Sequence, residues 1–383
     1  MTTKMTRDEL IGELKAMQML EGVDMSGMDL RGLPLSEHIL MNCDFTGANL
    51  AGVDLSACHL HNGKFAGADL SGANLTCAMA IDADFSGARM SGIILRGFQG
   101  IKCRFPGVDL SDAFFEDNQL SDADMTGVRW PANVKRFLSA GLQMEGGSAR
   151  GTMFERSLFT KPVLGNFDLS DATLSQSGMM EADFTGVNLD GTRFDRALML
   201  NADLSNRDFS GRDFTMTQFI GAKLANTRLT GTKLDKCNFT KADLTGADMS
   251  RAQAPMSSFV EANLAGTRLD GALLDYANFG QAQMTQASFA TTSLVGAGLV
   301  GAKLEGTRIS NAAMSYADLS HADMTASTLS GCDLRYSIWH RVKRDDNTRI
   351  SDCDMGGARG DDERRTMAED WLINQKLGQE VPR

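Results

Sequence analysis

The 383-residue sequence contains little proline, with six prolines against 39 glycines. Proline removes a backbone N–H group that a β-ladder needs, whereas glycine fits tight corners that require a positive φ. Long apolar runs are also absent, because no stretch reaches the roughly 18 residues that a membrane-spanning helix needs. These absences favour a chain of short extended pieces joined by many turns, and they predict no membrane span.

Export signals and a cysteine framework are missing as well. The N-terminus has no basic region followed by an apolar stretch and a cleavage site, so the expected location is the cytoplasm. The seven cysteines are odd in number and show no metal-ligand spacing, and we expect reduced thiols. A secretion route that needs no such signal stays open.

Positive charge is in the minority, and the formal net charge is −11. A nucleic-acid-binding protein normally shows a basic face, so we expect no direct nucleic-acid binding. The five histidines are scattered, and His59 and His61 lack the further ligands that would complete a metal site. No Gly-Lys-Ser/Thr phosphate loop is present. The sequence therefore predicts no enzyme, no cofactor and no metal.

The sequence does contain a repeat with a period of five. Large apolar residues lie five apart at Phe239, Leu244 and Met249, and a small residue stands two positions before each of them. Asn or Asp usually stands between the two. A period of five is neither the 3.6 of a helix nor the 2.0 of a strand. It indicates a chain that turns a corner once per period and sends two side chains inward on each side.

A second, fourfold longer period indicates how many sides each turn has. Phenylalanines recur at every fourth window in two blocks, about 25–130 and 154–339, which predicts fifteen four-sided turns whose rings stack along the axis. The predicted core column contains Phe45, Phe65, Phe85, Phe105, Phe159, Phe219, Phe239, Phe259 and Phe279.

The pattern A-[D/N]-[L/F]-[S/T]-G, present as Ala68-Asp69-Leu70-Ser71-Gly72 and Ala242-Asp243-Leu244-Thr245-Gly246, resembles the pentapeptide-repeat proteins. The resemblance implies an all-β solenoid, a right-handed quadrilateral β-helix in which four pentapeptides make one coil. The helix that runs directly into the repeats gives a weaker resemblance to pentapeptide-repeat proteins associated with type VI secretion. Some members of the family mimic DNA and occupy the DNA site of type II topoisomerases.

Breaks in the rhythm predict the boundaries of the segments. Thr6 and Glu9 have the spacing of a helix-capping box, and short helices are expected to cap both ends of the solenoid. The segment between the blocks is interpreted as a net insertion into the coil, either a protruding loop or a joint between two rods. The predicted segments are an N-terminal cap helix at 1–21, a first β-helix block at 22–130, an insertion or loop at 131–153, a second block at 154–340, a loop and partial coil at 341–360, and a C-terminal helix and tail at 361–383.

The predicted function is a non-catalytic scaffold that binds one or more proteins, with an adaptor role in type VI secretion as one form of it. The alternatives are a DNA mimic that acts on gyrase and a secreted effector, and a homodimer through the C-terminal helix is left open. Specificity is expected where the repeat is broken. The candidate partner-binding residues are Lys135, Arg136, Phe137 and Leu142 in the insertion, and Arg207 and Arg212 at small inward positions.

Overall fold

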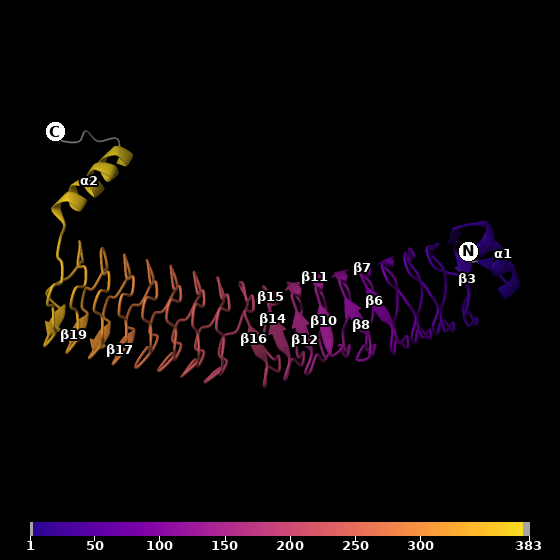
Figure 1. Cartoon of the computed structure of the whole chain (residues 1–383), viewed down its shortest axis with the longest axis horizontal. Helices are drawn as coiled ribbons and strands as arrows, with labels where there is room; N and C mark the ends of the chain where they lie inside the picture. The colour runs from indigo at the N-terminus through magenta and orange to yellow at the C-terminus, as the bar shows by residue number, and fades with distance from the viewer. Residues whose placement is uncertain (1–2, 378–383) are drawn as a thin grey trace. The chain divides into compact units, whose positions relative to one another are not determined.

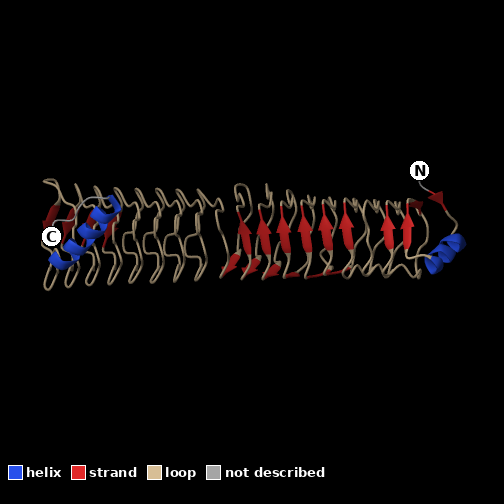
Figure 2. Cartoon of the chain, turned by 90° about the horizontal axis from the view of Figure 1, so that it is seen from above, coloured by secondary structure: helices blue, strands red, loops and turns tan. Residues whose placement is uncertain are grey.

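The chain folds as a parallel-strand β-solenoid of about 17 turns, with one short helix at each end (Figure 1). The computed structural model describes residues 3–377, and for 373–377 it describes the backbone alone. Contacts divide the chain into two compact units, Met1–Leu204 and Ser205–Arg383. Figure 2 shows the strands and the two helices. Neither helix of the described residues is long and apolar enough to cross a membrane.

One pentapeptide window explains why the chain turns so often. Ala242 and Leu244 point inward and are fully buried, while Asp243 between them points outward. The Asp243 carboxylate accepts a hydrogen bond of 3.0 Å from the backbone N–H of Thr245 and so closes the turn. Gly246 then takes a φ of +67°, which glycine adopts without a Cβ clash. The repeated motif therefore encodes a wall, a core residue and a corner.

Each coil pairs with the next coil through parallel backbone bridges. Asp243 lies between Lys223 and Asn263, so equivalent windows of successive coils lie side by side. The Leu244 N–H donates to the Asn263 carbonyl at 2.7 Å, and equivalent bonds recur along each unit. Four windows fill one turn, as the sequence predicts.

The longer strands of unit 1 form two six-stranded parallel sheets. One sheet contains β5 (Met79–Ile81), β7 (Gln99–Ile101), β9 (Gln119–Ser121), β11 (Leu138–Ala140), β13 (Leu158–Thr160) and β15 (Gly178–Met180). The other contains β6 (Ile94–Arg96), β8 (Phe114–Glu116), β10 (Asn133–Lys135), β12 (Met153–Glu155), β14 (Thr173–Ser175) and β16 (Arg193–Asp195).

The remaining strands lie toward the two ends. In unit 1, β1 (Thr3–Lys4) pairs with β3 (Val23–Asp24), and β2 (Met19–Glu21) pairs with β4 (Ile39–Met41). In unit 2, a four-stranded sheet contains β17 (Ser288–Ala290), β18 (Arg308–Ser310), β19 (Thr328–Ser330) and β20 (Arg349–Ser351).

Helix α1 (Arg7–Ala16) covers the beginning of unit 1. Thr6 and Glu9 form the predicted capping box, and Leu10 and Leu14 are buried. The Arg7 guanidinium donates to the carbonyl oxygens of Asp29 and Arg31, at 3.1 and 2.8 Å. Because β2 already contributes the buried Leu20 to the first coil, the solenoid begins before residue 22.

Stacked phenylalanine rings form part of the core of both units. In unit 1, Phe45, Phe65, Phe85 and Phe105 stack with ring centroids 4.6–4.8 Å apart. In unit 2, the rings of Phe219, Phe239, Phe259 and Phe279 stack at 4.8–5.0 Å. Their planes are nearly parallel, so each stack follows the direction in which the coils pile up.

The prediction of an insertion at 131–153 is wrong. This segment forms β10 and β11 and continues the coil, with Val134 paired to Phe115 and Leu138 paired to Gln119. In both pairs the sequence separation is one short of the regular period, so the coil has lost one residue. Trp130 and Val134 are consecutive inward residues four apart, and the rhythm of five resumes at Ser139.

This one-residue deletion also changes the column to which Phe159 belongs. Phe159 pairs with Ser139 and Met179, and Ser139 pairs with Leu120. Phe159 therefore does not extend the stack that ends at Phe105, as the sequence had suggested, and it makes edge-on contacts with neighbouring rings instead. Since the segment 131–153 is coiled, the solenoid has more turns than the fifteen predicted.

Candidate functional site

The six predicted partner-binding residues do not form one surface. Phe137 and Leu142 are fully buried in the core, so the prediction that they contact a partner is wrong. On unit 1, Lys135 is half-buried and lies 3.9 Å from Glu155, and Arg136 is exposed and pairs with Glu116 and Asp117.

Arg207 and Arg212 belong to unit 2 and are half-buried. The guanidinium carbon of Arg212 lies 5.6 Å from the centre of the Phe209 ring. Neither arginine is enclosed at the small inward position that it was assigned. These two residues stay candidates for partner binding, and the structure adds no further support for a site around them.

A more distinctive surface lies on one corner of unit 2. All three tyrosines of the chain stand there, at Tyr276, Tyr316 and Tyr336, and their exposed fractions are 62, 61 and 52%. The same corner carries Met256, which is 59% exposed, on the coil before Tyr276. We call this row, which also includes Met216 and Lys236, the tyrosine corner.

The tyrosine corner holds bulky side chains in an unfavourable backbone conformation. Tyr276, Tyr316 and Tyr336 have φ values of 57, 63 and 60°. This left-handed region costs an ordinary L-residue roughly 1–2 kcal/mol, and glycine occupies it at many other corners of the chain. Large aromatic residues therefore stand at positions where the fold favours small ones.

Glycines in the neighbouring coils make room for the rings. A Cβ atom added to Gly296 would lie 2.7 Å from the Tyr276 ring, and one added to Gly357 would lie equally close to Tyr336. Tyr316 stacks on Tyr336 with ring centroids 5.0 Å apart. Each tyrosine thus leans over the next coil, which leaves a broad part of the ring facing outward.

The flanks of the tyrosine corner carry little charge. On one side, Gln253, Leu273, Ser293 and Ala313 occupy successive coils, and Leu273 is 48% exposed. On the other side, Ser258, Asn278 and Gly298 occupy successive coils before Asp318 follows. The first column is uncharged over four coils, or roughly 14 Å between its outer strands at the usual strand spacing, and the second over three. Asp275 lies between the two columns, beside Tyr276. The fourfold longer period of the sequence reveals this row of tyrosines when the corner positions, and not only the core positions, are aligned.

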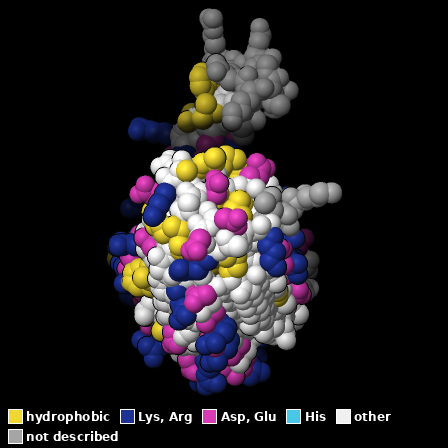
Figure 3. Space-filling model, turned by 90° about the vertical axis from the view of Figure 1, so that its right-hand side faces the viewer, with side chains coloured by type: hydrophobic (Ala, Val, Ile, Leu, Met, Phe, Trp, Pro, Cys, Tyr) yellow, Lys and Arg dark blue, Asp and Glu magenta, His cyan; other side chains and the backbone are white. Residues whose placement is uncertain are grey.

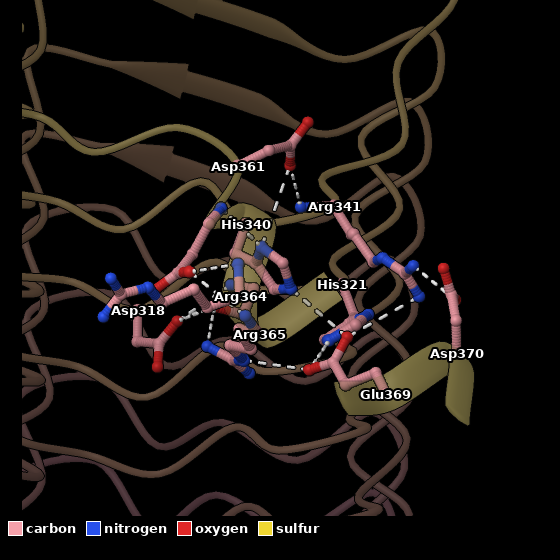
Figure 4. A network of polar contacts seen from close by, with 11 residues as sticks. Asp318, His321, His340, Arg341, Asp361, Arg364, Arg365, Glu369 and Asp370 are labelled. Atoms are coloured by element: carbon pink, nitrogen blue, oxygen red, sulfur yellow. Dashed lines mark hydrogen bonds and ion pairs between the residues drawn. The ribbon is translucent and has the colours of Figure 1, made fainter. Parts of the chain in front are cut away.

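A polar network holds helix α2 (Glu363–Leu377) against the flank of unit 2 (Figure 4). Glu369 lies between His321 and His340, and its carboxylate oxygens are 3.2 Å from Nε2 of each ring. Arg365 donates to the same carboxylate at 2.8 Å. Burial raises the pKa of Glu369, but hydrogen bonds from Arg365 and the two histidines outweigh it and lower the pKa to about 2.

Helix α2 begins where Asp362 caps it. The Asp362 carboxylate accepts hydrogen bonds from the N–H groups of Arg364 and Arg365, at 3.0 and 3.1 Å. The helix follows the last coil, as predicted, and packs on the flank through polar side chains. Its apolar residues Met367 and Trp371 are 71 and 46% exposed. The tail that was predicted after the helix includes residues 378–383, which lie outside the described residues.

A family model named Pentapeptide repeats matches the chain in eight copies. The matched residues are 39–76, 64–97, 179–215, 213–251, 257–290, 272–311 and 297–337, which together cover more than half of the chain. The chain belongs to the pentapeptide-repeat family. A search of curated proteins finds no match to it.

Solved structures of other pentapeptide-repeat proteins are also similar to this one. QnrB1 in a trypsin-treated form, described as a plasmid-mediated fluoroquinolone resistance protein, is 20% identical over 65% of this chain and 100% of its own, with a TM-score of 0.29. HetL from Nostoc, a protein involved in heterocyst differentiation regulation, is 20% identical over 82 and 88% of the two chains, with a TM-score of 0.17. A thylakoid-lumen protein of Arabidopsis thaliana is 34% identical over 27 and 64%, with a TM-score of 0.18. At these scores the family assignment rests on the family model, and none of these matches supports the type VI resemblance.

Charges on this pentapeptide-repeat protein alternate from coil to coil. Lys64 lies 3.6 Å from Asp44, and Arg228 lies 3.4 Å from Asp208, in each case on the preceding coil. Arg104 lies within 4.0 Å of the acidic residues of both neighbouring coils. Figure 3 shows basic and acidic side chains interspersed over the visible face. The walls therefore carry paired charges along these columns.

Proposed function

We propose that this pentapeptide-repeat protein is a non-catalytic scaffold that binds a protein partner at the tyrosine corner of unit 2. The exposed, strained tyrosines between two columns that carry little charge are the observation behind this proposal. Tyrosine is enriched among the residues that dominate binding at protein interfaces, and its ring adds contact area with little loss of conformational entropy. The partner that fits is a protein segment with apolar side chains that lie flat on the rings.

The proposal assigns structural roles, and no catalytic role, to the polar side chains. The polar groups that the structure brings together at α2 pair with one another, and their geometry serves to hold the helix on the coils. Asp and Ser residues along the walls close turns, as Asp243 does for Thr245. These side chains have a structural role in each repeat, which accounts for their abundance.

A matched pair of variants tests the proposal. Tyr276→Ser, Tyr316→Ser and Tyr336→Ser together remove the rings, while Lys241→Ser, Glu261→Ser and Gln281→Ser change another corner of unit 2 whose residues also have φ values near +60°. Partners captured by the wild-type chain are identified and their affinities are measured with both variants.

We expect the tyrosine variant to lose at least tenfold in affinity at an unchanged melting temperature, and the control variant to bind as the wild type does. Equal binding by all three proteins would refute the tyrosine corner as the docking surface. Loss with both variants would point to a general effect on unit 2.

The alternative of a gyrase-directed DNA mimic is less well supported. A mimic needs continuous acidic tracks in place of phosphates, and the columns described above pair acidic with basic residues. A supercoiling assay with purified gyrase distinguishes the two proposals, because a scaffold leaves supercoiling unchanged. The adaptor role in type VI secretion and the secreted effector remain hypotheses, and the genes that neighbour this one would test both.

A homodimer through α2 remains a proposal as well. Met367, Trp371 and Leu372 are all exposed on the described part of the helix, and Met355 in the last coil is 40% exposed. Trp371→Ser should then convert a dimer to a monomer in light scattering. If the wild-type chain is monomeric at high concentration, the apolar side of α2 does not mediate self-association.

A further inference from the structure

We propose that His321, His340 and Glu369 bind a divalent transition-metal ion of the Zn2+ class, and that this ion fixes α2 to the flank of unit 2. Among the residues that the structure describes, this is the one group of three such side chains whose ligand atoms all lie within 4.8 Å of one another. Figure 4 shows Glu369 reaching from the helix toward the two rings.

The distances between the ligand atoms suit a tetrahedral ion. Nε2 of His321 lies 3.2 Å from Oε1 of Glu369, and Nε2 of His340 lies 3.2 Å from Oε2 of the same carboxylate. Ligands that are each about 2.0–2.1 Å from a tetrahedral Zn2+ lie roughly 3.3–3.4 Å apart. Two imidazoles and one carboxylate form a common set of three protein ligands for zinc, and a water molecule would take the fourth position.

The fold places the ligands on rigid neighbours. The His321 N–H donates to the His340 carbonyl at 2.8 Å, so the two histidines lie on adjacent coils. Their ring centroids are 5.3 Å apart, the ring planes are nearly perpendicular, and both Nε2 atoms face the Glu369 carboxylate. His340 is 1% exposed, and a buried imidazole loses little freedom when it binds an ion.

An outer partner holds one of the three ligands, Glu369. Arg365 donates to Oε1 of Glu369, the oxygen that faces His321, and leaves Oε2, which faces His340, for the ion; hydrogen bonds to a ligating carboxylate are usual in metal sites. The Asp362 N–H donates to Nδ1 of His340, so the imidazole proton now lies on Nε2. An ion at Nε2 requires that this proton move to Nδ1, so metal binding has to break the hydrogen bond from Asp362.

The opposing possibility is that the same residues form a metal-free latch. Arg365 and Arg341 already neutralise Glu369, and Arg341 also pairs with Asp370. A latch of this kind holds α2 through hydrogen bonds alone. It predicts that neither chelator nor metal changes the protection of the helix.

The experiment uses the full chain after treatment with a chelator. Zn2+ is titrated by calorimetry, and Co2+ is titrated by the visible absorption that a tetrahedral site produces. We expect one ion per chain and at least a tenfold loss of affinity in Glu369→Gln and in His321→Ala, neither of which removes a fully buried side chain. Hydrogen exchange of residues 363–372 should slow on addition of Zn2+ in the wild type and not in these variants.

The chain offers a matched control in its other histidine pair. The rings of His59 and His61 lie 5.7 Å apart in unit 1, and no third ligand groups with them among the described residues. His59→Ala with His61→Ala should retain the Zn2+ affinity of the wild type. The proposal is overturned if this control loses binding as the site variants do, if the wild type binds Co2+ without tetrahedral absorption, or if α2 exchanges at the same rate with and without metal.

Discussion

Replacing Phe239 by alanine should destabilise unit 2 more than any change on its walls. Phe239 is fully buried between Phe219 and Phe259, each 5.0 Å from its ring centre. The lost burial and the cavity cost about 3–5 kcal/mol. Removal of two stacked ring pairs adds about 1–3 kcal/mol. Leucine at this position refills most of the volume, so Phe239→Leu should cost about 1–3 kcal/mol, the contribution of stacking alone.

Urea unfolding gives the free energies, and hydrogen exchange shows where they act. In a solenoid each coil contacts only its neighbours, so faster exchange in Phe239→Ala should be greatest in the coils on either side. Asp243→Asn keeps an oxygen that accepts from Thr245, and it should change stability by less than about 0.5 kcal/mol. Equal losses in Phe239→Ala and Asp243→Asn would refute the assignment of inward and outward positions.

Three further changes test the packing and the ionisation of the core. Asn118→Ala should cost about 1–3 kcal/mol in urea unfolding, because it leaves a buried carbonyl and a buried N–H without partners. Gly100→Ala should cost about 1–3 kcal/mol in the same assay, since its Cβ would lie 2.6 Å from Leu120. Burial raises the pKa of Cys103 to about 11 and that of Cys237 to about 12, whereas unfolded thiols ionise at about 8.5. Their contribution is complete below that pH and is lost as pH rises toward 11–12, so replacing both by alanine should flatten the alkaline decline of the melting temperature.

The repeat was predictable because it depends on local chemistry. A small residue, an Asp or Asn and a large apolar residue follow one another in the window, as Ala242, Asp243 and Leu244 do. The Asp carboxylate then closes the turn by accepting a hydrogen bond from the backbone two residues later. The exchange of a large for a small residue near Gly100 could also be seen in the sequence. In the structure Phe98 points inward against Phe85 and Phe105 and fills the space that Gly100 leaves.

The register at Trp130 was not predictable in the same way. Two of the inward residues after it, Ser139 and Ala149, are small, and a shift of one residue hides the rhythm that they share with Val134 and Met144. The pairings of Val134 with Phe115 and of Leu138 with Gln119 show that the coil continues. A partner site was therefore predicted where the chain forms core, and Phe137 is the clearest example.

The residues around Glu369 were missed for a different reason. His321 and His340 stand 48 and 29 positions before Glu369, and no spacing in the sequence indicates that a helix folds back on the flank. Their meeting depends on the direction in which the chain leaves the last coil. Tertiary placement of this kind is absent from a one-dimensional pattern.

The left-handed corners separate what this protein can vary from what it must keep. A side chain such as Tyr316 points away from the core and closes no turn, so exchanging it leaves the ladder and the interior unchanged. Duplication of the stretch that forms one coil would copy its corner residue onto the adjacent rung and would stack like on like, as Tyr316 and Tyr336 stack. Lineages of this architecture can therefore lengthen, shift or erase a recognition surface by gaining and losing whole coils, with no new fold to evolve.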